Sequence, residues 1–408
     1  MTNNEKALKM HEEWNGKIET TAKAHVNSRE DLAIAYTPGV AEPCKEIKEN
    51  KDLSFEYTCR GNMVAIVSDG TRVLGLGDIG PEAAMPVMEG KAALFKTFGD
   101  VDAVPICIDT KDPAKIIETV RFLQPSFAGI NLEDISSPKC YDIECELKKI
   151  CDIPVFHDDQ HGTAIACLAA VIGALRFVKK DMKTAKFVVN GCGAAGSAIG
   201  RLLISMGAEN VTMVDRFGAL YEGIDANLDR IQSYLATVTN KEHKKGTLAD
   251  IAKGADVLIG VSAPNVFTKE IIASMADKAI VFALANPVPE TSYADAIEAG
   301  AAVAGTGRSD SPNQVNNVTV FPGVFRGAID VRAKAITEEM KVAAVYAISE
   351  LIDEKDLRAD YVVPDAFDPR VAPAVAAAVA RVAMETGIAR IKVDPEEVRA
   401  NTMKRVGR

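Results

Sequence analysis

The chain has 408 residues, of which 48% are apolar and 25% charged, and its formal net charge is −10 at pH 7. This length exceeds an ordinary single domain, so we expect two or three domains in a globular protein. The acidic balance and the lack of a Lys/Arg block argue against nucleic acid as a partner.

The N-terminus is polar and charged and lacks the apolar core of a signal peptide. The longest apolar run, 164–175, is shorter than the roughly 18 residues needed to cross a membrane, and we predict a buried helix there. Eight scattered cysteines lack the paired spacing of a zinc site and are typical of reduced thiols. We therefore expect a cytoplasmic protein that does not bind a membrane.

Residues 1–160 are predicted to form an N-terminal α/β domain. Four short apolar runs each end in acidic residues: 63–69, 103–109, 127–134 and 153–159. Helical stretches lie between them at 86–98 and 113–123. Alternating strands and helices predict a parallel sheet. The acids then follow the carboxyl ends of strands, where open α/β sheets bind their ligands.

Two acid pairs are prominent in this domain, Glu133-Asp134 and Asp158-Asp159. Mg²⁺ and Mn²⁺ prefer carboxylate oxygens and water. Three carboxylates from neighbouring strand ends would hold such an ion and leave positions open for a substrate. A pair of solvated turns is the alternative, and spacing does not decide between them. His161 follows the second pair, and we interpret it as a residue behind the ligands or at a helix start.

Residues 161–325 repeat the strand–helix alternation and predict a Rossmann-type NAD(P)-binding domain. Its strands are expected at 185–191, 210–215, 256–262, 279–286 and 301–307. The remaining segment, 326–408, is predicted to be helical, with Ala- and Val-rich helices at 331–352 and 373–386. These helices would pack on the other domains or form a dimer interface, and periodicity does not distinguish the two.

A G-x-G-x-x-G pattern, formed by Gly191, Gly193 and Gly196, follows the first of these strands. Ala194 and Ala195 then begin an Ala-rich helix, which is the context that the dinucleotide fingerprint requires. The first glycine permits a tight turn, the second lets the backbone approach a pyrophosphate, and the third lets the helix pack closely. Free N–H groups at the helix start attract phosphate. A glycine turn without a nucleotide is the alternative interpretation.

Asp215 ends the next strand, 19 residues after Gly196. A carboxylate at this point accepts hydrogen bonds from the adenine ribose hydroxyls and repels a 2′-phosphate. The pattern therefore favours NAD. Arg216 could offset this charge, so NADP is the alternative.

Further candidates for chemistry are single residues. Tyr36 lies in a turn-like segment and Lys91 in a helical one; either alone would be taken as structural. Arg72 lies in a glycine-rich loop after a strand, where its guanidinium would suit a carboxylate. Asn286 and Asn317 follow late Rossmann strands, at the rim where a nicotinamide would lie.

Taken together, these segments give a strong family resemblance. Nearly the whole chain resembles the malic enzymes in their short bacterial form, in the motifs AYTPGVA, SDGTRVLGLGDIGP, EGKAALFKTFGDVDAVPI, NLEDI, FHDDQHGTA, NGCGAAG, FALANPVPE and NNVTVFPG. The resemblance implies oxidation and decarboxylation of L-malate to pyruvate and CO₂, with NAD(P) and Mg²⁺ or Mn²⁺. It also suggests a homodimer or a higher homo-oligomer.

The same resemblance implies a role for each candidate. The acid–base residues would be Tyr36 as general acid and Lys91 as general base, with Asp158 setting the charge of the lysine. The metal ligands would be Glu133, Asp134 and Asp159. Arg72 and Asn317 would hold the malate carboxylates, and Asn286 would lie between malate and the nicotinamide. The cofactor would contact Gly191, Gly193, Ala194, Ala195, Gly196, Asp215, Asn286 and Asn317.

One residue departs from the family pattern. Phe217 stands where these enzymes often carry a Lys two residues after the acid, and this supports NAD. In the implied mechanism, burial and the metal keep Lys91 neutral, so that it accepts the C2 hydroxyl proton as hydride leaves. Tyr36 then protonates C3 of the enolate that decarboxylation leaves.

Three other functions remain open from the sequence. A malolactic enzyme would use the same site but release lactate rather than free NADH. A nucleotide-binding regulatory protein would show no turnover. A plain 2-hydroxy-acid dehydrogenase would release no CO₂ and would not need the acid pairs.

Overall fold

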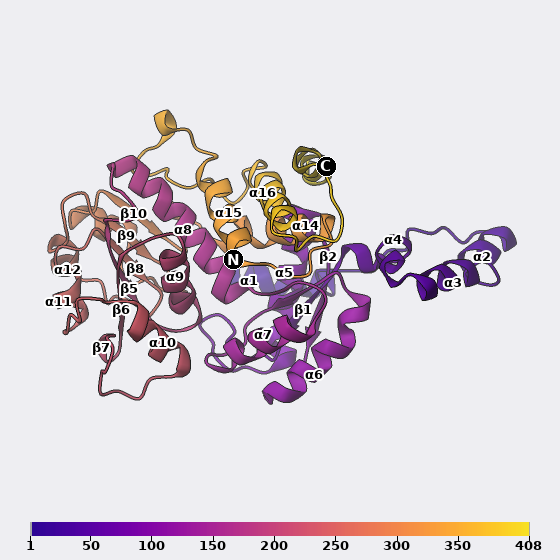
Figure 1. The fold of residues 1–408 in the computed structure, drawn as a ribbon, viewed down its shortest axis with the longest axis horizontal. Coiled ribbons are helices and arrows are strands. Elements are labelled where there is room, and N and C mark those ends of the chain that lie inside the picture. Colours follow the sequence, from indigo (N-terminus) through magenta and orange to yellow (C-terminus); the bar gives the residue numbers. More distant parts are fainter. Residues whose placement is uncertain (1, 408) are drawn as a thin grey trace.

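Two β-sheets form the frame of the computed structural model, which describes residues 2–407 (Figure 1). The first sheet is wholly parallel, as predicted, with the strand order β2-β1-β3-β4. Its strands are β1 (Met63–Ser68), β2 (Asp102–Cys107), β3 (Gly129–Leu132) and β4 (Val155–His157). Because β3 and β4 are neighbours, the acid pairs that follow them meet at one edge of the sheet.

Helices cover both faces of this sheet. One face, with Val64 and Ile66, packs on α5 (Pro81–Gly99), and the other, with Ala65 and Val67, packs on α6 (Pro113–Leu123) and α7 (Lys139–Ile150). The prediction for α6 is confirmed. Helix α5 begins five residues before the predicted start at 86, because Pro81 occupies its first turn and Pro86 lies inside the helix.

The second sheet has six strands in the order β10-β9-β8-β5-β6-β7. The strands are β5 (Lys186–Asn190), β6 (Asn210–Asp215), β7 (Gly218–Ala219), β8 (Val257–Gly260), β9 (Ile280–Ala283) and β10 (Val303–Thr306). All pairs are parallel except the short β6–β7 hairpin, which the sequence did not predict. The helices between the strands of this second sheet are α9 (Ala194–Ser205), α10 (Arg230–Val238), α11 (Leu248–Ala252), α12 (Lys269–Ala273) and α13 (Tyr293–Glu298).

Helix α8 (Asp158–Val178) connects the two sheets and packs closely on α9 (Figure 1). With 21 residues and a mean hydropathy of 1.7 it is long enough to cross a membrane, so the expectation of a shorter element was wrong. The helix is longer than the apolar run 164–175 because it also includes the polar residues of its first turn. However, 83% of its most apolar window is buried, which confirms the prediction of a core helix.

The C-terminal helices lie together over α5 and α8 (Figure 1). They are α14 (Phe321–Asp330), α15 (Glu338–Ser349), α16 (Val371–Glu385) and α17 (Pro395–Val406). The predicted helix 331–352 is wrong in its first turns, because Thr337 forms a capping box that starts α15 at Glu338. The domain division at 160 and 325 stays a prediction, since α8 and α14 run across these positions.

An arm near the N-terminus extends away from the body (Figure 1). It contains α2 (Arg29–Ala35), α3 (Ala41–Glu49) and α4 (Ser54–Tyr57), whereas α1 (Asn3–Trp14) is not part of it. None of these four helices has a buried residue. An arm without a core of its own gains little hydrophobic stabilisation from this chain.

Candidate active site

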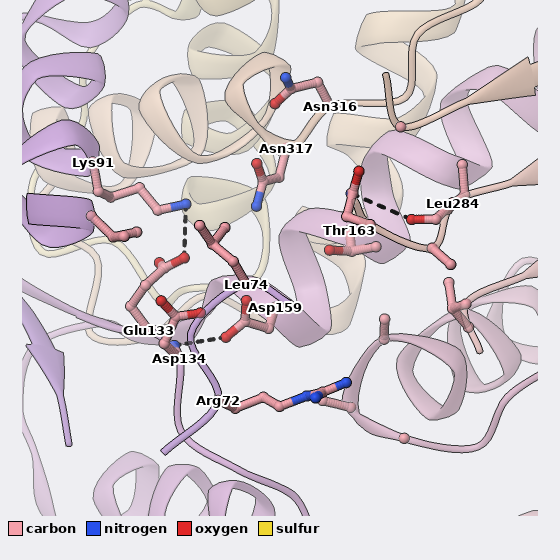
Figure 2. Close-up of a pocket in the computed structure, with 18 of the residues that line it drawn as sticks. Arg72, Leu74, Lys91, Glu133, Asp134, Asp159, Thr163, Leu284, Asn316 and Asn317 are labelled. Atoms are coloured by element: carbon pink, nitrogen blue, oxygen red, sulfur yellow. Dashed lines mark hydrogen bonds and ion pairs between the residues drawn. The ribbon is translucent and has the colours of Figure 1, made fainter. Parts of the chain in front are cut away.

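A cleft of about 960 Å³ lies between the two sheets. Most predicted site residues line it together: Arg72, Lys91, Glu133, Asp134, Asp159, Gly193, Ala194, Ala195, Asn286 and Asn317. Figure 2 shows the acids on one side, with Lys91 and Asn317 directed toward them. A volume of this size accommodates a small acid together with the reactive end of a dinucleotide.

Three carboxylates meet at the edge of the first sheet. Glu133, Asp134 and Asp159 each offer an oxygen, and these oxygens lie within 4.8 Å of one another. The backbone N–H of Asp134 donates to Asp159 Oδ2 at 2.9 Å, which joins the two strand ends. Asp134 has a φ of +54°, an uncommon conformation for a non-glycine residue, and its buried Oδ2 has no hydrogen-bond partner.

The electrostatics of these acids suit a divalent cation. Burial and the neighbouring Asp159 raise the pKa of Asp134 to about 8. Burial likewise raises the pKa of Glu133 well above its usual value, although Lys91 opposes the shift. The cluster therefore holds more carboxylates than its own cations balance, and hard oxygen donors with an unpaired lone pair fit Mg²⁺ or Mn²⁺.

Lys91, on α5, is buried against the same acids. Its Nζ lies 3.0 Å from Glu133 Oε1 and 2.5 Å from Asp158 Oδ2, and it sits over the Phe321 ring at 4.2 Å. Burial alone would lower the pKa of Lys91, but the charges of Asp158 and Glu133 raise it above its usual value. Burial alone therefore does not make this amine neutral, because its carboxylate partners hold the proton. The expectation that burial and a metal ion together keep Lys91 neutral stays a prediction.

Asp158 lies behind the cleft rather than in it. It is fully buried, and its Oδ2 accepts hydrogen bonds from both Lys91 and the Asn317 side-chain amide. Gly162, one turn further along α8, leaves room for this carboxylate, since a Cβ there would lie 1.9 Å from Asp158 Oδ1. Asp158 thus connects Lys91 on α5 to the 3₁₀ turn Asn317–Thr319.

The remaining polar residues reach the cleft from loops. The backbone N–H of Arg72 donates to the Asp134 carbonyl at 3.0 Å, which holds this loop against the acids. The Arg72 side chain extends along the cleft toward the start of α9 (Figure 2). Asn286 follows β9 and donates from Nδ2 to the Leu284 carbonyl at 3.5 Å.

The glycine loop has the geometry of a phosphate-binding turn. Gly191 has a φ of +110°, and a Cβ on Gly196 would lie 1.8 Å from the Gly191 carbonyl oxygen. Nothing lies within 4 Å of a Cβ built on Gly193, whose backbone faces open space. Helix α9 starts at Ala194 without a side-chain cap, so its first N–H groups are available to an anion.

A second hollow continues from Gly193 past the end of β6. Asp215 lines it, and its carboxylate accepts from Gln232 Nε2 at 3.0 Å and from the Arg216 backbone N–H at 2.7 Å. Arg216 stacks over the Phe217 ring, 4.8 Å from its centroid. This hollow suits the adenosine half of a dinucleotide.

Tyr36 is the one predicted catalytic residue that the structure does not bring to the acids. It ends α2 on the N-terminal arm, 67% exposed, and does not line the cleft of the described chain. Conversely, Thr163 and Lys17 line the cleft and were not predicted. Thr163 follows the acid pair by one helical turn, a usable signal, whereas Lys17 lies 69 residues from Pro86, whose carbonyl it contacts at 2.6 Å, and no motif marks it.

A Rossmann-type sheet facing an acidic cleft defines the chain as an α/β dinucleotide-binding enzyme. Two family models match it: the N-terminal domain of malic enzymes over residues 15–115, and their NAD-binding domain over 160–384. The chain belongs to the malic enzyme family.

Individual relatives are similar over almost the full chain. A bifunctional malic/malolactic enzyme of Bacillus subtilis is 56% identical, over 99% of this chain and 98% of that protein. An NAD-dependent malic enzyme of Geobacillus stearothermophilus is 51% identical, over 92% and 78%. A crystal structure of malic enzyme from Pyrococcus horikoshii superposes with a TM-score of 0.96 at 46% identity, covering 100% of this chain and 96% of that one.

Proposed function

We propose that this protein oxidises and decarboxylates L-malate to pyruvate and CO₂ with a nicotinamide cofactor and Mg²⁺ or Mn²⁺. The observation that carries the proposal is the meeting of Lys91 with three buried carboxylates opposite the glycine-loop helix, in one cleft. The family match and the notable shortage of positive charge among these acids support it.

Glu133, Asp134 and Asp159 would hold the divalent ion. When bound, the ion supplies Lewis-acid stabilisation of charge on the substrate oxygens, and the nicotinamide accepts hydride. Arg72, whose loop is held against the acids and whose side chain extends along the cleft, is suited to bind a malate carboxylate through its guanidinium. Asn286, on the rim between the two sheets, orients the substrate against the nicotinamide.

Lys91 is the residue that accepts the proton from the C2 hydroxyl as the C2 hydrogen leaves as hydride. Its contacts with Glu133 and Asp158 keep it protonated in the protein alone. A divalent charge at the acids opposes these carboxylates and favours the neutral amine that a base requires. Asp158 and Asn317 position the amine from behind.

We propose NAD as the preferred cofactor. Asp215 lines the adenosine hollow with its carboxylate held by Gln232, where it would repel a 2′-phosphate. Arg216, the nearest cation in sequence, stacks on Phe217 rather than pairing with this acid. Comparison of kcat/KM for NAD and NADP tests the choice, and a clear NADP preference would refute it.

A malolactic reaction is a second candidate, because the Bacillus subtilis relative is named for both activities. The same cleft would serve if NADH stayed bound and reduced pyruvate to lactate. Incubation of the protein with malate, Mn²⁺ and NAD, followed by measurement of free NADH, pyruvate, lactate and CO₂, distinguishes the reactions. Pyruvate with an equal amount of free NADH supports the proposal; no CO₂ release from malate would refute both.

We also propose a homodimer in which the arm of one copy brings Tyr36 to the cleft of the other. The arm exposes Leu32, Ile34 and Tyr36, and the loop beside the cleft exposes Leu74 and Leu76. Joining such surfaces would bury apolar area that a single chain leaves in water. The cleft would then gain the general acid that protonates C3 of the enolate. The cytoplasmic location stays a prediction.

Subunit complementation tests this arrangement. Tyr36→Phe and Lys91→Ala should each be nearly inactive alone. After the two variants are mixed and reassociated, about half of the dimers contain one copy of each. If the site is shared, one of the two sites in each mixed dimer carries neither substitution, so about a quarter of wild-type activity should return. Failure to regain activity, with mixed dimers demonstrated by a tag, would place Tyr36 and Lys91 in the same subunit.

A further inference from the structure

A second buried cluster of charged residues lies behind the acids, on the far side of the first turn of α8. It contains Glu144 of α7, His161 of α8 and Lys341 of α15, each at most 5% exposed. None of these three described residues lines the cleft. The mechanism proposed above does not use them, although three separate helices converge on this point.

Glu144 is the centre of the cluster. Its Oε1 accepts from His161 Nε2 at 2.7 Å and from Lys148 Nζ at 2.6 Å, and it also receives the backbone N–H of His157 at 3.3 Å. Its Oε2 accepts from the Gln160 side-chain amide at 3.1 Å. One carboxylate thus contacts His157, Gln160 and His161, which bracket Asp158 and Asp159 in sequence.

Glu144 stays ionised and can accept these hydrogen bonds across the neutral pH range. Burial would raise the pKa of the Glu144 carboxyl, but the His161 ring and the Lys148 ammonium outweigh it and lower the pKa well below its usual value. The Glu144 carboxylate can only accept and the Lys341 ammonium can only donate. The His161 ring therefore donates from Nε2 to Glu144 and accepts at Nδ1 from Lys341 Nζ, 3.0 Å away.

The helix start that Glu144 contacts has no side-chain cap. His157 is the N-cap of α8, and its side chain makes no capping hydrogen bond. Among the described residues, neither of its buried ring nitrogens has a hydrogen-bond partner, and Nδ1 lies 3.8 Å from Asp159 Oδ2. The first turn of α8 therefore depends on contacts from other elements: Asp134 and Lys91 at the front, and Glu144 at the back.

We propose that Glu144 is a positioning residue that fixes the turn carrying Asp158 and Asp159, and so sets the affinity of the site for a divalent cation without touching it. This inference rests on the metal site of the proposed function. Residues that orient metal ligands from behind typically contribute 10- to 100-fold to affinity. A carboxylate that joins three residues around two acids is well placed to do the same.

The test is Mn²⁺ binding to the full chain without substrate, followed by electron paramagnetic resonance of the free ion. Glu144→Gln keeps the shape of the side chain but loses its charge and turns one acceptor into a donor facing Gln160. We expect the Kd for Mn²⁺ to rise by roughly 10- to 100-fold, with kcat at saturating Mn²⁺ much less affected. Gln160→Met removes the hydrogen bond to Glu144, together with the one that Gln160 Oε1 accepts from Arg201 at 3.1 Å. It should raise the Kd by a smaller factor, about threefold or more.

Two controls separate positioning from general stability. Glu146→Gln, on the exposed face of the same helix where Glu146 pairs with Lys149, should leave the Kd unchanged. Val120→Ala, in the buried core of α6, should lower the melting temperature but leave the Kd within about twofold of wild type.

The outcomes are distinct. If Glu144→Gln binds Mn²⁺ with wild-type affinity, the positioning role is overturned while the metal site stands. Gln160→Met gives the same test if Glu144→Gln does not fold. Weakening in Val120→Ala equal to that in Glu144→Gln at matched stability also overturns it. If wild-type protein fails to bind Mn²⁺, or Asp159→Asn binds it normally, the proposed metal site itself falls and takes this inference with it.

Discussion

The two charged clusters on either side of the first turn of α8 contrast sharply. At the front, Glu133, Asp134 and Asp158 all have raised pKa values, because burial and mutual repulsion outweigh the contact with Lys91. At the back, the pKa of Glu144 is lowered, since its cationic and hydrogen-bonding partners outweigh burial. Both clusters are buried to a similar degree, so exposure does not explain the difference.

Charge balance is what distinguishes them. The back cluster satisfies itself with residues of the chain, which is typical of a structural network. The front cluster brings carboxylates close together and leaves Asp134 Oδ2 without a hydrogen-bond partner among the described residues. Such an unfavourable arrangement is typical of a site that a bound ligand completes. The contrast predicts that changes at the front affect chemistry and ion binding, and that changes at the back act through position or stability.

The largest effect is expected from Lys91→Ala. Loss of the proposed base should reduce malate oxidation by roughly 10²–10⁴-fold. Mn²⁺ affinity should stay the same or increase, because a positive charge that competes with the ion is removed. The matched change at the back, Lys341→Met, should leave kcat within a few-fold. Equal losses of activity in the two variants would erase the distinction between the clusters.

Gly162→Ala should have the next largest effect, since this position faces Asp158 at the junction of the two clusters. The added methyl would lie 1.9 Å from Asp158 Oδ1, so the carboxylate must shift from Lys91 and Asn317. A displacement of this kind can lower kcat about 10²-fold. Gly254→Ala, at a position where nothing lies within 4 Å of the added methyl, controls for the loss of a glycine and should retain activity. Unchanged kcat in Gly162→Ala would show that the position of Asp158 is not critical.

Metal addition should have a moderate effect on stability. Mn²⁺ at 100 times its Kd should stabilise the fold by about 2.7 kcal/mol, which is a rise of several degrees in melting temperature. EDTA should reverse the rise and abolish turnover. Asp159→Asn should show no rise, whereas Glu146→Gln should behave as wild type. A rise that persists in Asp159→Asn would locate the ion elsewhere.

The smallest effect is a pH dependence of the back cluster. Burial lowers the pKa of Lys341 to about 8, despite its contact with Glu338 at 2.6 Å. A lysine with a lowered pKa costs stability while charged, and this cost disappears as pH rises from about 8 toward 10.5. Between pH 7.5 and 9.5, wild type should therefore gain about 2 kcal/mol relative to Lys341→Met.

Melting temperatures of the two proteins across this range measure that gain. Lys355→Met, in an exposed pair with Asp353, should show no such difference from wild type. A constant gap between wild type and Lys341→Met would mean that Lys341 does not titrate in this window.

The front cluster was accessible from sequence because its parts follow a rule. Strands of a parallel sheet end at one edge, so the acids after β3 and β4 had to lie near each other. The glycine loop was equally local, since Gly191 and Gly196 shape one turn. The strand prediction failed only at β7, whose two residues carry no periodic pattern.

The back cluster was not accessible in this way. Glu144, His161 and Lys341 come from three helices, and up to 180 residues separate the ones that touch. Glu144 and Lys341 would each be taken for a surface charge in its own helical pattern. His161 was interpreted as a residue behind the ligands or at a helix start, but its two partners carried no signal. The position of Tyr36 could not be predicted either, because its motif indicates a chemical role but not the surface against which the arm packs. Long-range packing, rather than local propensity, decides both cases.

Helix α8 has a consequence for how this sequence can vary. It is buried along nearly its full length, and its residues 164–175 are mostly Ala, Val, Ile and Leu. At Gly173 a Cβ would lie 1.8 Å from the Val362 carbonyl oxygen, so even the smallest side chain does not fit. A scan of all substitutions should find this stretch nearly immutable, with Gly173 the least tolerant position although it is remote from any chemistry.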